Sequence, residues 1–215
     1  MARKITIPKD PSPGKNYFLL DANVLVYVGL PRRLQKVNLP AKERARAARC
    51  TAWLEAVKRQ CKQGRARVYI PDVVIAEAFK VLAKWYYRDG WFGRNAVAYN
   101  QAKNRLRGYV AQTHREMAKM DRQVMVHDEP VNRDVIIGVD RFLEPMFKAK
   151  LNVQIVDLLL LSIAKYLTDF YDISKDRLYI LTCDKHLVKL TRLLRDVPTA
   201  IDPTDERYDP SSTFV

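Results

Sequence analysis

The chain has 215 residues, enough for one sizeable hydrophobic core, and its 38 Lys and Arg against 24 Asp and Glu give a formal charge of +14. This excess favours nucleic acid as the partner over an anionic membrane surface, because no basic stretch also carries a strong aromatic or leucine stripe. No apolar stretch is long enough to span a membrane, and no apolar segment of a signal peptide precedes Pro8. The three cysteines form no CxxC pair, so we expect reduced thiols in a cytoplasmic protein without a structural zinc site.

Short apolar runs alternate with longer helical patterns. In chain order we predict a strand at 17–20, helices at 24–28 and 41–62, a strand at 68–70, helices at 73–87 and 95–122, a strand at 124–126, helices at 132–149 and 153–169, a strand at 178–182, a helix at 185–194 and a strand at 198–201. Asp72 is the predicted N-cap of the helix at 73–87. Alternating strands and helices predict a three-layer α/β/α sandwich around a mostly parallel sheet of four to five strands.

We expect one domain over residues 17–202, with a helical elaboration around 90–122, because no linker divides the middle of the chain. Residues 1–16 carry four basic residues and predict a flexible basic N-terminal arm. Residues 203–215 are polar and slightly acidic, and predict a flexible C-terminal tail.

Two of the apolar runs stop at an aspartate. Asp21 follows the run Tyr17-Phe18-Leu19-Leu20, and Asp184 follows the run 178–183. Open α/β sheets place their ligands outside the carboxyl ends of the strands, so the two acids can share one crevice. Paired carboxylates repel each other unless they are protonated or bridged by a cation, which suggests a divalent-metal site.

Two further acids lie in apolar helical segments. Glu77 has apolar neighbours in the helix at 73–87, and Asp157 lies early in the Leu-rich helix at 153–169. An isolated buried charge in such a run is costly, although a helix N-terminus offsets part of the cost for Asp157. Four carboxylates are hard oxygen ligands that suit Mg²⁺ or Mn²⁺.

Each acid taken alone also has a structural interpretation. Asp21 is an N-cap or turn residue, Glu77 a half-exposed helix charge, and Asp184 the cap of the helix that begins at Lys185. Asp157 can pair with Lys150 or Lys165. The metal-site interpretation therefore rests on the joint pattern.

The joint pattern resembles the PIN-domain nucleases, a family that includes the VapC-type toxins. The matching pieces follow in order over residues 17–202: Asp21-Ala22-Asn23-Val24-Leu25, Glu77 in an apolar helix, Asp157 before a Leu-rich stretch and Ala164, and Leu181-Thr182-Cys183-Asp184. The resemblance implies the three-layer fold, dependence on Mg²⁺ or Mn²⁺, and cleavage of single-stranded or structured RNA.

Carried over residue by residue, the resemblance makes an acidic pocket of the catalytic and metal-binding residues Asp21, Glu77, Asp157 and Asp184. Asn23 stands where many members have a hydroxyl residue, and Thr182 can hydrogen-bond an acid or a phosphate. Lys185 and His186 are placed to touch substrate. The interval between Glu77 and Asp157 is longer than in compact members, so the substrate and partner of those members do not carry over directly. No acid follows Asp184 closely, and this absence favours one metal ion over two.

The basic residues gather in two predicted helices. From these we select four candidates for binding RNA: Arg44, Arg49, Arg105 and Arg107. Four aromatic residues can either stack on bases or belong to the core: Tyr99, Tyr109, Trp85 and Trp91.

We therefore predict a metal-dependent endoribonuclease that leaves a 5′-phosphate and a 3′-hydroxyl. It is either an RNA-processing enzyme or the toxin of a toxin–antitoxin pair, with an antitoxin partner and a homodimer. One alternative is an inactive RNA-binding or scaffold module, and another is a structure-specific DNA nuclease. A phosphatase with a nucleophilic aspartate is disfavoured, because it needs an acid where this chain has Asn23.

Overall fold

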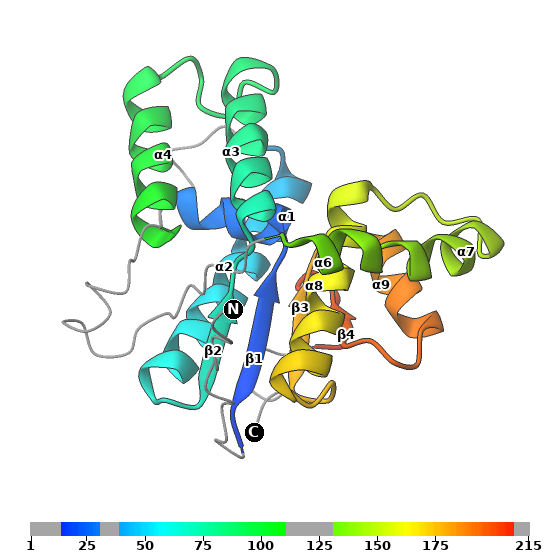
Figure 1. The fold of residues 1–215 in the computed structure, drawn as a ribbon. Coiled ribbons are helices and arrows are strands. Elements are labelled where there is room, and N and C mark those ends of the chain that lie inside the picture. The colour runs from blue at the N-terminus through cyan, green and yellow to red at the C-terminus, as the bar shows by residue number, and fades with distance from the viewer. Residues whose placement is uncertain (1–13, 31–38, 111–130, 209–215) are drawn as a thin grey trace, which may run out of the picture.

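A parallel four-stranded sheet organises the part of the chain that the computed structural model describes, which is residues 14–30, 39–110 and 131–208 (Figure 1). Its strands are β1 (Asn16–Leu20), β2 (Ala66–Tyr69), β3 (Leu178–Leu181) and β4 (Thr199–Ile201), in the spatial order β2-β1-β3-β4. Phe18 pairs in register with Val68 on one side and with Tyr179 on the other. All carboxyl ends of the strands therefore lie at one edge of the sheet.

Helices cover both faces of this sheet. The sheet-covering helices are α2 (Ala41–Lys62), α8 (Ile155–Tyr171) and α9 (Lys185–Leu193). The chain moves from β1 to β2 in one direction through α2, and from β2 to β3 in the opposite direction through α8. Because parallel crossovers are right-handed, α2 and α8 lie on opposite faces. The predicted three-layer α/β/α sandwich is confirmed.

The core follows from this layering. Strands of a parallel sheet are buried on both faces, and Phe18, Leu19 and Leu20 of β1 are fully buried. Trp53 of α2 and Leu160 and Leu161 of α8 fill the two layers beside the sheet. Since β1 is flanked by β2 and β3, the residue that follows it is set in the centre of the carboxyl edge.

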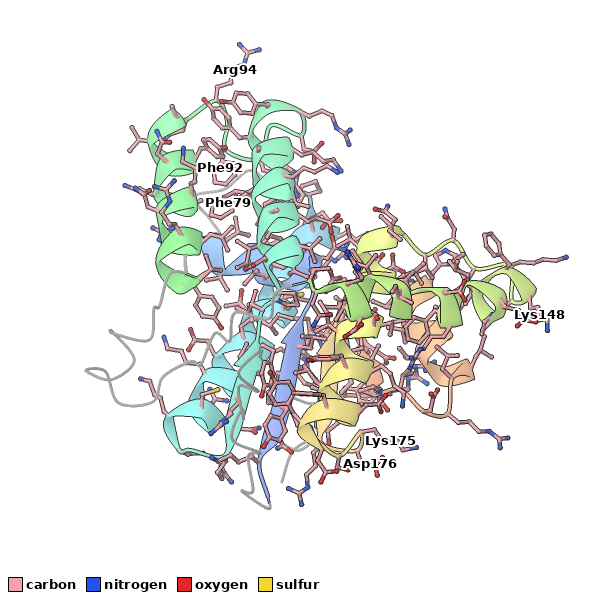
Figure 2. All side chains as sticks on the ribbon, in the orientation of Figure 1. Phe79, Phe92, Arg94, Lys148, Lys175 and Asp176 are labelled. Atoms are coloured by element: carbon pink, nitrogen blue, oxygen red, sulfur yellow. The ribbon has the colours of Figure 1, made fainter. Side chains whose placement is uncertain are left out.

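Beyond the carboxyl edge, a helical hairpin projects from the sheet (Figure 1). It is formed by α3 (Asp72–Tyr87) and α4 (Ala96–Val110), and Phe79 and Phe92 lie between the two helices (Figure 2). Trp85 and Trp91 stack at 4.2 Å between ring centroids and are buried, so they belong to the core rather than to a base-stacking surface. The short helix α1 (Ala22–Leu25) and the 3-10 turn η1 (Val26–Gly29) follow β1 in the chain. They pack against α3 and α4 and so hold the hairpin at this edge.

Two smaller helices lie beside the same edge (Figure 1). They are α6 (Arg133–Gly138) and α7 (Asp140–Lys148), where the sequence predicted one continuous helix at 132–149. The break leaves α6 against α8, where the Ser162 hydroxyl donates to the Val135 carbonyl over 2.6 Å. A Cβ added to Gly138 would lie only 2.5 Å from the Ser162 oxygen, so the close approach of α6 and α8 depends on glycine.

Most predicted elements agree with the structure within two residues. Besides the break between α6 and α7, the predicted N-cap of α3 was wrong. Pro71 is the N-cap and Asp72 is the first helical residue, because the extended backbone of Pro71 directly precedes the helical turn. The predicted strand at 124–126 and the end of the helix predicted at 95–122 lie outside the described residues.

The ends of the chain are described in part. Residues 1–13 and 209–215, which belong to the predicted arm and tail, lie outside the described ranges. Residues 203–208 are held against α2, where Arg49 donates hydrogen bonds to the carbonyls of Pro203, Asp205 and Tyr208. None of the helices described here has the length and apolar character needed to cross a membrane.

Candidate metal centre

Asp21 lies at the centre of the carboxyl edge and is 1% exposed. Its backbone N–H donates to the Leu181 carbonyl over 3.0 Å, which continues the pairing of β1 with β3 to this residue. Its carboxylate oxygen Oδ2 accepts from the Thr182 hydroxyl over 2.6 Å and from the Asn23 amide over 3.3 Å. Burial raises the pKa of Asp21 to about 6, and these two hydrogen bonds offset part of the rise.

Asp157 enters the same place from the first turn of α8 and is 6% exposed. Burial raises its pKa to about 8, and repulsion from Asp21, Asp184 and Glu77 adds to the effect. A hydrogen bond from the backbone of Gln154 at the N-cap opposes the rise. The predicted alternative partner Lys165 instead pairs with Asp169 and Asp196, at 2.8 Å and 3.6 Å.

Asp184 occupies the turn between β3 and α9. Its oxygen Oδ1 accepts from the backbone N–H groups of His186 and Leu187, at 2.6 Å and 2.9 Å, so Asp184 caps α9. Both of these bonds fall on Oδ1, which leaves Oδ2 out of the cap. Capping and ligand binding can therefore use different oxygens of the same carboxylate.

Thr182 connects two of the acids. Its hydroxyl donates to Asp21 and accepts from the backbone N–H of Asp184 over 2.9 Å. Because one side chain spans both aspartates, the end of β3 fixes where each stands relative to the other. The hydrogen bond predicted between Thr182 and an acid is present, and its part in catalysis stays a prediction.

Glu77 completes the group from α3. It is half-buried, and its charge raises the pKa of both Asp21 and Asp157. Four carboxylates thus reach one edge from four segments: the end of β1, α3, the start of α8 and the end of β3. Their mutual repulsion is the electrostatic condition that a divalent cation relieves.

The donor set fits Mg²⁺ or Mn²⁺ chemically, because all four side chains offer hard carboxylate oxygens. Among the residues that the structure describes, no three His, Cys, Asp or Glu side chains are already gathered as a metal-binding group. The fit is therefore one of donor chemistry and charge, and it requires the side chains to move together around an ion.

The other predicted site residues lie around this edge. Lys185 and His186 are both exposed in the first turn of α9. The His186 ring accepts at Nδ1 from the backbone N–H of Asn152 over 3.4 Å, which ties α9 to the segment before α8. Lys185 directly follows Asp184 in the chain and is the cation nearest to it in sequence.

The four RNA-binding candidates are not equivalent. Arg49 was assigned to RNA from its charge, but its guanidinium donates to three carbonyls of the segment 203–208, so its observed contacts are structural. Arg44 donates weakly to the Leu39 carbonyl over 3.4 Å and Arg105 to the Gly29 carbonyl over 3.5 Å. Arg105 and Arg107 are exposed on α4.

Two cysteine thiols lie close together next to the acidic residues, and nothing in the sequence indicated this pairing. Cys183 lies between Thr182 and Asp184, and its sulfur is 3.5 Å from that of Cys50 in α2. The hydrogen bond with Cys50 and the guanidinium of Arg46 lower the pKa of Cys183, while the same contact and burial raise the pKa of Cys50. The two cysteines are 133 residues apart, so only the tertiary structure could pair them.

No protein-family model matches the sequence, and no curated protein matches it. Solved structures that share part of the fold include VapBC2 from Rickettsia felis bound to a promoter DNA fragment, with 12% identity, 86% of this chain and 99% of that chain covered, and a TM-score of 0.48. FitAcB from Neisseria gonorrhoeae has 15% identity, 86% and 97% coverage and a TM-score of 0.47. VapBC-1 from nontypeable Haemophilus influenzae has 15% identity, 88% and 99% coverage and a TM-score of 0.41. At these scores we draw neither family nor function from the likeness.

Proposed function

We propose that the protein is a nuclease that depends on Mg²⁺ or Mn²⁺ and hydrolyses phosphodiester bonds of RNA. One observation supports the proposal most. Asp21 and Asp157 are both buried, and the charges of Asp21, Asp184 and Glu77 all repel the carboxylate of Asp157. Described contacts supply no cation to this group: Lys165 is paired with other acids. Such an arrangement costs stability unless something positive binds there.

The residues divide the work by position. Asp21, held by Thr182 and Asn23, is the fixed member of the set. Asp157 is fixed by the start of α8, and Asp184 by its cap on α9. Glu77 is half-buried at the rim and has the longest carboxylate side chain, so it is the member best able to orient or deprotonate a water.

The ion contributes the chemistry that carboxylates lack: when bound, Mg²⁺ or Mn²⁺ acts as a Lewis acid on the scissile phosphate and lowers the pKa of water. The protein residues orient the water for in-line attack on the phosphorus atom and keep it from binding in other orientations. The products are a 5′-phosphate and a 3′-hydroxyl. The formal charge of +14 supports a polyanionic substrate.

The direct test compares four single variants in cleavage of a single-stranded RNA with Mn²⁺. Asp21→Asn and Asp157→Asn are expected to lose at least about a hundredfold in rate, because each removes a charged ligand. Asp134→Asn and Asp140→Asn are the matched controls, since both acids are exposed in the first turns of α6 and α7. If both pocket variants fold and cleave as fast as the parent, the assignment is wrong.

Two measurements separate the alternatives. Calorimetry with Mn²⁺ reports binding to the pocket in the parent and its loss in Asp157→Asn; a parent that binds no ion would be an inactive RNA-binding module instead. Cleavage of flap DNA in preference to RNA would identify a DNA nuclease.

A toxin role is a narrower candidate, which we derive from the motif resemblance. It adds an antitoxin that covers the pocket, and a homodimer. Expression of the parent in a bacterial host would then arrest growth, while the Asp21→Asn variant would not. Equal growth of the two strains would favour an RNA-processing enzyme.

A further inference from the structure

One face of α3 carries cations that lead away from the acidic pocket. Lys80, Lys84 and Arg88 follow Glu77 at intervals of three, four and four residues, which places them on the same side of the helix as Glu77. All three are exposed, whereas Glu77 is half-buried beside Asp21. The face therefore runs from the pocket outward along the projecting hairpin (Figure 1).

An exposed aromatic ring stands at the outer end of this face. Tyr87 is 78% exposed, which is unusual for a side chain of that size. Its ring meets the edges of Tyr86 and Tyr99, with centroids 4.7 Å and 5.9 Å away. Tyr86 and Tyr99 stack on each other at 4.4 Å and join α3 to α4. The ring is thus braced by the hairpin while most of its surface stays open to solvent.

The distance between Glu77 and Tyr87 suits a single-stranded nucleic acid that is bound at one end by the acidic pocket. With a rise of about 1.5 Å per residue, Tyr87 lies about 15 Å along the axis from Glu77, and the lysines lie between them. Cations along that path neutralise phosphates, and an aromatic ring stacks on an unpaired base irrespective of its identity. The ion pair of Arg88 with Asp89, at 3.3 Å, is solvent-exposed and so competes weakly.

We propose that Lys80, Lys84, Tyr87 and Arg88, here called the α3 track, bind the single-stranded RNA that flanks the scissile phosphate. The proposal rests on the proposed function for the identity of the substrate. The track binds without reading sequence: its lysines hold phosphates, and Tyr87 stacks on a base about 15 Å from the pocket, measured along the helix axis. The distance between pocket and ring then sets how many nucleotides beside the cut must be unpaired.

The test measures binding and not cleavage. A fluorescent single-stranded oligoribonucleotide is titrated with the full chain in EDTA, and its anisotropy is followed at several salt concentrations. The double variant Lys80→Ala/Lys84→Ala should bind at least about tenfold more weakly, and the slope of log K against log salt should fall by about 1.4, at 0.7 for each lost phosphate contact. Tyr87→Ala should weaken binding about tenfold, and Tyr87→Phe should keep the affinity.

The matched control removes the same charge elsewhere. Lys62 ends α2 and Lys175 precedes β3, so both belong to the opposite edge of the sheet, and Figure 2 shows Lys175 far from Arg94 at the hairpin tip. Both are exposed. Lys62→Ala/Lys175→Ala should change affinity less than about twofold. Equal losses in the two double variants would mean that only net charge matters, and would overturn the proposal.

A failed track and a failed function give different results. Because EDTA removes divalent ions, binding to the track does not depend on the acidic pocket. Normal RNA binding by the α3 variants, together with inactive Asp21→Asn, would reject the track and leave the nuclease. Weak RNA binding by the α3 variants, together with fully active Asp21→Asn, would reject the nuclease and leave the track. An unchanged affinity for RNA joined to a lost affinity for an acidic protein would assign the face to a protein partner instead.

Discussion

The hydroxyl of Thr182 donates to the buried carboxylate of Asp21 over 2.6 Å while accepting from the backbone N–H of Asp184 over 2.9 Å. One side chain at the end of β3 therefore positions an acid of its own strand turn and an acid of the neighbouring strand. The same bond lowers the pKa of Asp21 against the effect of burial. The Thr182 hydroxyl therefore contributes both to the position of Asp21 and Asp184 and to the pKa of Asp21.

Replacement of Thr182 tests this relationship. Thr182→Val keeps the shape but leaves Asp21 without its shortest hydrogen bond, and should lower the free energy of unfolding by about 1–3 kcal/mol at pH 7. Urea denaturation measures the change. Thr182→Ser retains the hydroxyl and should restore most of the stability. Similar losses in the two variants would show that the methyl group and not the hydrogen bond matters.

Asp157 should make stability fall as pH rises. Its pKa is about 8 in the folded chain against 3.8 as its ordinary value, so between these values the native state holds a proton that the unfolded state has released. The free energy of unfolding then decreases from pH 4 to pH 8. Asp157→Asn should stabilise the metal-free protein by about 2 to 5 kcal/mol at pH 8 and by little at pH 4.

Thermal unfolding in EDTA at several pH values measures this difference. Asp21, with a pKa of about 6, should leave a smaller slope of the same sign below pH 6 in the variant. Saturating Mn²⁺ should reverse the ranking, because it binds the parent more tightly. A stability gain that is constant from pH 4 to pH 8 would contradict the assigned pKa.

The contact of α6 with α8 depends on one glycine. Gly138→Ala introduces a Cβ 2.5 Å from the Ser162 oxygen and should destabilise the fold by about 1–3 kcal/mol. Gly108→Ala is the matched control: it lies in α4 with nothing within 4 Å of the added atom, and should stabilise by about 0.5–1 kcal/mol. Chemical denaturation compares the two, and opposite signs are expected.

Replacing Arg49 should lower the free energy of unfolding more than it lowers the affinity for RNA. Arg49→Ala removes the donors to Pro203, Asp205 and Tyr208 and should release the segment 203–208 to proteolysis, with a loss of about 1–3 kcal/mol. RNA affinity should fall no more than in Lys62→Ala. A large loss of affinity in the folded variant would restore the role that its charge alone suggested.

An oxidant should convert the thiols of Cys50 and Cys183 into a disulfide. Diamide takes two protons and two electrons from the pair and becomes the hydrazine, while the Sγ–Sγ distance closes from 3.5 Å to about 2.0 Å. Mass spectrometry should find the linked peptides in the parent and in Cys61→Ser, and not in Cys50→Ser. We expect slower RNA cleavage after oxidation, since the bond pulls on the residue between Thr182 and Asp184. Unlinked thiols after treatment would contradict the observed proximity.

The sequence by itself predicted the four strands that the structure describes and most helix boundaries, and it singled out the four acids as candidates. Buried parallel strands read as continuous apolar runs, so an aspartate directly after such a run marks the carboxyl edge wherever the strands pair. Local patterns also predicted the cap at Asp184, because an N-cap depends only on the next three residues.

Only the tertiary structure decided what depends on segments far apart in the chain. Burial of Asp21, the bond from Thr182 and the repulsion that raises the pKa of Asp157 arise when β1, β3, α3 and α8 meet. The contacts of Arg49 with the segment 203–208 and the pairing of Cys50 with Cys183 could not be predicted either, because charge and residue type do not show which distant atoms become neighbours. Hydrogen bonds and desolvation act over a few ångströms of space, and the fold alone sets those distances.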